Sequence, residues 1–88
     1  MPDRRPPVDV KELGERLKEL RGERTQDDVV RAVEANQGFR MTASALSLLE
    51  RGGADSPGAR ILDALAREYG ETVEYLLYGV RPAKKKGA

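Results

Sequence analysis

Cysteine and histidine are both absent from this chain of 88 residues. Their absence excludes a disulfide framework, a thiolate or imidazole metal site, a Ser-His triad and a cysteine nucleophile. Paired carboxylates do not replace these groups, because Asp27 and Asp28 are adjacent and so point to different faces of a helix. Gly52 and Gly53 lack the lysine and hydroxyl of a phosphate-binding glycine loop. We therefore expect no enzyme activity, and no metal, cofactor or small-molecule ligand.

Long apolar runs are also missing. The first seven residues contain charge and proline but no apolar signal-peptide core, and no later segment approaches the roughly 20 apolar residues that a membrane span needs. The chain is long enough for one small domain and too short for two. These features predict a soluble cytoplasmic protein of one domain with no membrane partner.

Charge is distributed unevenly although the net charge is only +1. Residues 10–79 carry ten Lys/Arg against thirteen Asp/Glu, net −3, while residues 1–9 and 80–88 together carry six basic and two acidic residues, net +4. We expect a flexible, basic and proline-rich arm over 1–9 and a flexible basic tail over 80–88. Such segments attract nucleic-acid phosphates in some proteins and only aid solubility in others. The basic residues concerned are Arg4, Arg5, Lys84, Lys85 and Lys86.

Apolar residues recur at helical spacing in five segments, and no alternating run is long enough for a strand. The first helix should begin at Val10 and end at Arg21 or Gly22. Thr25 can cap the second, which should end near the turn signal at residues 36–38. The apolar positions are Val10, Leu13, Leu17 and Leu20; Val29, Val30 and Val33; Leu46 and Leu49; Ile61, Leu62, Leu65 and Ala66; and Val73, Leu76 and Leu77.

The last two helices follow a loop with several breakers. Asp55 or Ser56 can cap the fourth helix with Pro57 at its first position. Thr72 can cap a short fifth helix that Gly79 ends. The predicted fold class is therefore all-α, with five short helices around a core of leucine and valine.

The third helical segment, MTASALSLLERG over residues 41–52, is the most informative one. Thr42 can cap its start, Leu46 and Leu49 can bury one face, and Gly52 can end it. The opposite face carries short or apolar side chains: Ala43, Ser44, Ser47 and Leu48.

The order of these pieces resembles the helix-turn-helix domain of the phage-repressor and Cro superfamily, the xenobiotic-response-element type. The resemblance covers residues 10–79 and depends on LGERLKELR over 13–21, TQDDVV over 25–30, the segment 41–52, and LAREYGETVEYLLYG over 65–79. It implies a compact, lambda-repressor-like domain of five helices, with the helix-turn-helix motif at the second and third.

The resemblance also implies double-stranded DNA as the partner of a homodimer. A recognition helix over residues 42–51 would lie in the major groove, with Thr42 near a phosphate. Gln26 matches a glutamine that touches a phosphate and braces the first recognition residue, and Arg21 and Glu50 match a partly buried ion pair. The candidate DNA contacts are Gln26, Arg40, Thr42, Ala43, Ser44, Ser47, Leu48 and Arg51, with Arg60, Arg4, Arg5, Lys84, Lys85 and Lys86 toward the backbone.

The exposed chemistry of that helix is limited. Serine hydrogen-bonds to several base edges without choosing well among them, while Ala43 and Leu48 can pack on thymine methyl groups. No arginine, asparagine or glutamine stands there to make a bidentate base contact, worth about 1–3 kcal/mol of discrimination. Specificity would then depend on thymine methyls, operator shape, half-site spacing and minor-groove contacts by the arm.

Two departures from the family pattern leave alternatives open. The segment from Gln26 to Thr42 is longer than in relatives, through an extended second helix or through a loop. The loop GGADS after the third helix lacks basic residues that bind the DNA backbone in relatives.

An alternative function is a protein-interaction module on the same fold, such as an antitoxin or a phage-encoded inhibitor or adaptor, with Leu48 in its interface. Three tyrosines could line a dimer seam or simply pack: Tyr69, Tyr75 and Tyr78.

Overall fold

The computed structural model describes residues 8–54 and 57–81. This part of the chain is helical and contains no strand, so the all-α prediction is confirmed. The cap candidates Asp55 and Ser56 lie outside the described residues, as do Arg4, Arg5 and the three tail lysines. The five helices are α1 (Val10–Arg21), α2 (Gln26–Gln37), α3 (Ala43–Glu50), α4 (Ala59–Tyr69) and α5 (Val73–Tyr78).

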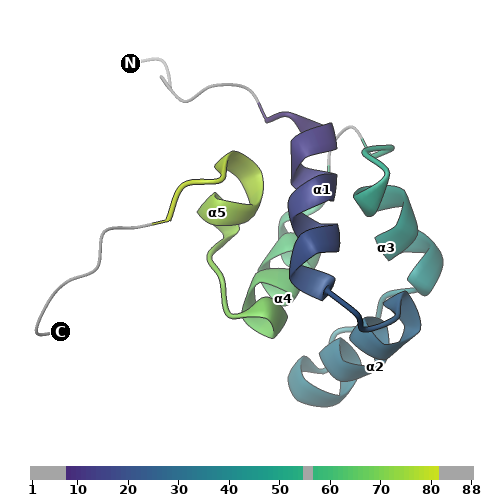
Figure 1. The fold of residues 1–88 in the computed structure, drawn as a ribbon. Helices are drawn as coiled ribbons and strands as arrows, with labels where there is room; N and C mark the ends of the chain where they lie inside the picture. Colours follow the sequence, from purple (N-terminus) through teal and green to yellow (C-terminus); the bar gives the residue numbers. More distant parts are fainter. Residues whose placement is uncertain (1–7, 55–56, 82–88) are drawn as a thin grey trace, which may run out of the picture.

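α1 lies between α5 and α3 at the centre of the view (Figure 1). α3 and α5 both contact α1 and lie on opposite sides of it, while α4 runs behind. α2 lies below α1 in this view and packs against α3 and α4, and α4 also contacts α5. The α2–α3 pair therefore occupies one side of the domain, with α5 across α1 from α3.

A single core holds this arrangement. Every helix contributes at least one fully buried side chain to it, and burying such a side chain stabilises the fold by about 1.5–3 kcal/mol. The apolar faces predicted from helical spacing therefore meet in one cluster. Its seven fully buried side chains are Leu13, Leu17, Val29, Val33, Leu46, Leu65 and Leu76.

Threonine caps begin three of the helices, as their positions in the sequence predict. Thr25 Oγ1 accepts from the Asp28 amide at 3.0 Å, and Asp28 accepts from the Thr25 amide at 3.2 Å, which completes a capping box. Thr42 and Thr72 cap α3 and α5 through one amide each. Asp9, which the sequence did not single out, caps α1 through the Lys11 and Glu12 amides.

The predicted start of α4 is wrong. The helix begins at Ala59 with Gly58 as its N-cap and no side-chain capping bond, so Pro57 does not occupy the first helical position. The first buried residue of α4 is Leu62, whose amide donates to the Gly58 carbonyl at 3.2 Å. The helix therefore begins two residues later than the sequence predicted.

Arg16 joins the two chain-distant helices α1 and α5. Its Nε donates to the main-chain oxygen of Leu76 and its Nη2 to that of Leu77, both at 2.9 Å. These oxygens lie at the carboxyl end of α5, where a helix leaves carbonyls without internal partners and where positive charge is favourable. The guanidinium thus caps α5 from α1, a role that no local sequence signal indicates.

None of the helices in the described ranges combines the length and the apolar character that crossing a lipid bilayer requires.

Candidate nucleic-acid interface

The connection between α2 and α3 settles the first open alternative. α2 extends to Gln37, where Gly38 adopts a left-handed conformation with φ of 68° and donates its amide to the Glu34 carbonyl. Residues 38–42 then lead to α3. The extra length is therefore divided between a helix of 12 residues and a loop.

Hydrogen bonds attach the last turn of α2 to α4. Gln37 Nε2 donates to the Ala64 carbonyl at 2.9 Å, and Asn36 Nδ2 donates to Glu68 Oε1 at 3.2 Å. Because both side-chain amides donate to α4, they do not bond to their own backbone in a turn, which is consistent with Asn36 and Gln37 remaining helical.

α3 separates an apolar face from an open one. Leu46 and Leu49 are buried in the core, as their spacing predicts. The other side of the helix is open to solvent, with Leu48 at 43% exposure. The residues predicted to contact DNA from this helix are exposed at Thr42, Ser44, Leu48 and Arg51 and half-buried at Ala43 and Ser47.

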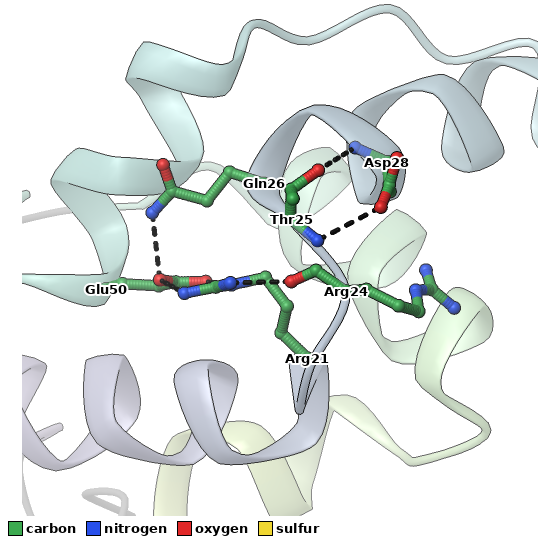
Figure 2. Close-up of polar contacts among 6 residues, drawn as sticks. All are labelled: Arg21, Arg24, Thr25, Gln26, Asp28 and Glu50. Atoms are coloured by element: carbon green, nitrogen blue, oxygen red, sulfur yellow. Dashed lines mark hydrogen bonds and ion pairs between the residues drawn. The ribbon is translucent and has the colours of Figure 1, made fainter.

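Glu50 stands at the centre of a polar network that joins three helices (Figure 2). Arg21 donates to both of its carboxylate oxygens, from Nε at 2.8 Å and from Nη2 at 2.9 Å. The Glu50 side chain is only 5% exposed and that of Arg21 only 16%. This geometry is the bidentate pairing in which arginine binds carboxylate most strongly, and it fixes the end of α3 to α1.

Gln26 joins the same network from the first turn of α2. Its Nε2 donates to Glu50 Oε1 at 3.0 Å (Figure 2). The structure thus attaches Gln26 to the last residue of α3, and its contacts with a phosphate and with the first recognition residue stay predictions. One amide hydrogen and the carbonyl oxygen of Gln26 remain without a partner in this network.

The arginines predicted to contact DNA differ in the partners that they already have within the protein. Arg40 pairs with Glu34 at 3.2 Å, but both side chains are at least half exposed, so the pair contributes little and is easily exchanged. Arg60 lies over the Phe39 ring, 5.9 Å from its centroid. Arg51 is exposed and forms no ion pair with a carboxylate in the described ranges.

An open groove of about 530 Å³ lies between the end of α2 and the outer side of α4. Asp63 and Arg67, which pair with each other at 3.0 Å, stand on its α4 side, and Phe39 with Arg60 stand at the α2–α3 loop. The lining mixes opposite charges and does not select a ligand class. Within residues 8–54 and 57–81 no cluster of three or more potential metal ligands is present.

The tyrosines near the C-terminal helices are engaged within the domain. The Tyr69 hydroxyl is buried and has no hydrogen-bond partner among the described residues. Arg81 stacks over Tyr75 at 4.1 Å from the ring centroid and binds Glu71 through two hydrogen bonds. Tyr78 is half-buried on α5. A dimer seam at these residues stays a prediction.

Comparison with known proteins adds one positive result. A family model described as a helix-turn-helix domain matches residues 12–76, which is more than half of the chain. The chain belongs to this family. The matched part of the helix-turn-helix domain runs from α1 into α5, and includes the α2–α3 pair and the network around Glu50. Neither curated proteins nor solved structures give a match.

Proposed function

We propose that this helix-turn-helix domain is a DNA-binding transcriptional regulator of the phage-repressor or Cro type, which lays α3 in the major groove of double-stranded DNA. The observation that carries the proposal is the two-sided α3: one face is buried against the core, the other is open, and Glu50 holds its end in place. The major groove of B-DNA admits a helix of this kind.

Contacts to the DNA backbone would come from several elements around α3. Its N-terminus presents main-chain amides near Thr42, and Gln26 retains one amide hydrogen beside the Glu50 bond. Arg51, Arg40 and Arg60 supply positive charge. Phosphate contacts from these residues would set the register of α3 on DNA, while its open face would meet the base edges.

The proposal includes a homodimer and basic terminal segments. A homodimer would present two α3 helices to two half-sites, with α5 and its tyrosines forming the dimer seam. The basic arm and tail would add non-specific phosphate attraction. A DNA partner agrees with a cytoplasmic location and with a role that involves no catalysis.

Fluorescence anisotropy with a random duplex of about three helical turns, measured across a salt series, tests the DNA partner. We expect affinity to fall with salt at a slope of about −0.9 per phosphate contact. Replacing Arg4, Arg5, Lys84, Lys85 and Lys86 with glutamine should make that slope shallower. No binding to the duplex at low salt would refute the proposal.

A second candidate function is the protein-interaction module, and one observation favours it. Residues 10–79 have a net charge of −3, and most arginines of the described part are already engaged with carboxylates or carbonyls. In the salt series a module of this kind would show almost no DNA affinity to lose, which separates it from the regulator.

A further inference from the structure

We infer that Leu48 reads the methyl groups of thymine in the major groove, and that Gly53 is the positioning residue that holds the Leu48 side chain in place. The inference rests on the proposed function and names the base chemistry that α3 would recognise.

The end of α3 forms a Schellman motif. Gly52 has a left-handed φ of 73°, its amide donates to the Leu49 carbonyl at 3.1 Å, and the Gly53 amide donates to the Leu48 carbonyl at 3.0 Å. In this motif the residue at the position of Gly53 usually packs its own side chain on the residue at the position of Leu48. Here that side chain is missing.

The side chain of Leu48 uses the free space. A Cβ built on Gly53 would stand 2.6 Å from Leu48 Cδ1 and 3.4 Å from Leu48 Cγ. The leucine therefore lies directly against the Gly53 backbone, although it is 43% exposed. One side of it is supported by the chain and the other faces solvent, so the apolar group has a defined position on an open surface.

The surroundings of Leu48 favour a base edge over a protein partner. The exposed large apolar residues of the described chain are Leu48 and Val80, and Val80 follows α5, which lies across α1 from α3 (Figure 1). On the exposed side of α3, Leu48 stands between Ser44 and Arg51, and no second large apolar residue of the described chain is exposed on this helix, whereas protein interfaces present contiguous apolar patches.

Thymine offers what such an isolated side chain can bind. Its 5-methyl group is the apolar feature of the major groove, where the other base-edge groups are hydrogen-bond donors and acceptors. The leucine side chain has no polar atom that could bind those donors and acceptors. The short hydroxyl of Ser44, one turn earlier, leaves Leu48 room to approach the methyl group.

Replacement of thymine by uracil tests the inference, because it removes the methyl group and leaves base pairing unchanged. The probe is the set of duplexes that the wild-type protein enriches from a random pool, synthesised again with uracil at one thymine at a time. We expect about fourfold weaker binding for each methyl group that Leu48 contacts. For Leu48→Ala, the thymine and uracil duplexes should bind equally.

Two glycine variants separate the positioning role from general effects. Gly53→Ala places its methyl group against a flexible side-chain end, so the domain should remain folded while Leu48 moves and the thymine-to-uracil ratio falls toward one. Gly58→Ala is the matched control, because nothing lies within 4 Å of the added Cβ, and it should keep the wild-type ratio. Circular dichroism verifies that each variant is folded.

The possible failures are distinguishable. Equal binding of all thymine and uracil duplexes by the wild-type protein overturns the reading role, while salt-dependent affinity for those duplexes still supports the regulator. An unchanged ratio in Gly53→Ala overturns the positioning role alone. If the pool yields no enriched duplex and random DNA does not bind at low salt, the proposed function and this inference both fail.

Discussion

Gly14 on α1 lies against the main-chain oxygen of Glu50 at the end of α3, and a Cβ at position 14 would stand 2.5 Å from that oxygen. The same Cβ would stand 2.6 Å from the carbonyl oxygen of Leu49. Both neighbours are backbone atoms, so neither can rotate away. Because Arg21 binds the Glu50 side chain from the same helix, α1 holds the end of α3 through backbone contact and through charge.

Gly14→Ala should destabilise the domain by about 1–3 kcal/mol, because the added methyl group forces α1 and α3 apart. A loss of stability would distinguish this contact from helix propensity, since alanine in an exposed helix interior is more favourable than glycine by about 1 kcal/mol. Urea unfolding monitored by circular dichroism measures the free energy of unfolding. An increase in stability would show that α1 and α3 do not approach this closely.

Arg21→Met should lower the free energy of unfolding by about 3 kcal/mol, the lower end of the range for removing one partner of a buried ion pair. The reason is that the Glu50 side chain, only 5% exposed, would lose its main hydrogen-bond donor. Arg67→Met is the matched control, because its pair with Asp63 is exposed and should contribute less than about 0.5 kcal/mol. Equal losses in the two variants would contradict the special role of Glu50.

Gln26 and Glu50 should be energetically coupled in DNA binding, because the carboxylate orients the amide that we propose to face a phosphate. The effects on binding free energy of Gln26→Ala and Glu50→Gln should be non-additive by about 0.5 kcal/mol or more. A double-mutant cycle by anisotropy measures this, with Gln26→Ala and Arg67→Met as the control pair, which shares no partner. Additive effects would mean that Glu50 does not orient Gln26 toward DNA.

Tyr69 should give the domain a loss of stability at high pH. Burial raises the pKa of Tyr69 to about 12 in the folded protein, against about 10 for an exposed tyrosine. Because the folded pKa is the higher one, the stabilisation is complete below pH 10 and is lost as pH rises toward 12. Urea unfolding of the wild type and of Tyr69→Phe between pH 8 and 12 checks this.

The phenylalanine variant should lack that dependence, since it has no hydroxyl to ionise. At pH 7 it should differ from the wild type by less than about 1 kcal/mol, because the Tyr69 hydroxyl has no hydrogen-bond partner among the described residues to lose. The same loss between pH 10 and 12 in both proteins would assign the effect to another group.

Much of the fold could be predicted from local patterns. Helical spacing of leucine and valine identified the buried faces, and Thr25, Thr42 and Thr72 were identified as caps because a cap depends on residues within one turn. The start of α4 was missed, since Pro57 beside a possible cap is a local signal for a helix start, whereas the helix begins at Ala59 after Gly58.

The candidate site was predictable only in outline. The family pattern identified α3 and the pair of Arg21 with Glu50, but it did not indicate the hydrogen bond from Gln26 to Glu50, which depends on how α2 and α3 approach each other. The contact of Gly53 with Leu48 depends on the tertiary structure, since a glycine in a loop has the same sequence signal whether or not a leucine lies against it.

By itself the sequence determined which segments become helices and which of their faces are apolar. It also determined that the short side chains of α3 face away from the core. These properties depend on neighbours within a few residues. The tertiary structure alone decided that Glu50 gathers Arg21 and Gln26, that Gly14 admits the end of α3, and that Leu48 is held at the surface. Those relationships depend on how separate helices approach each other, which is set by the packing of the whole core.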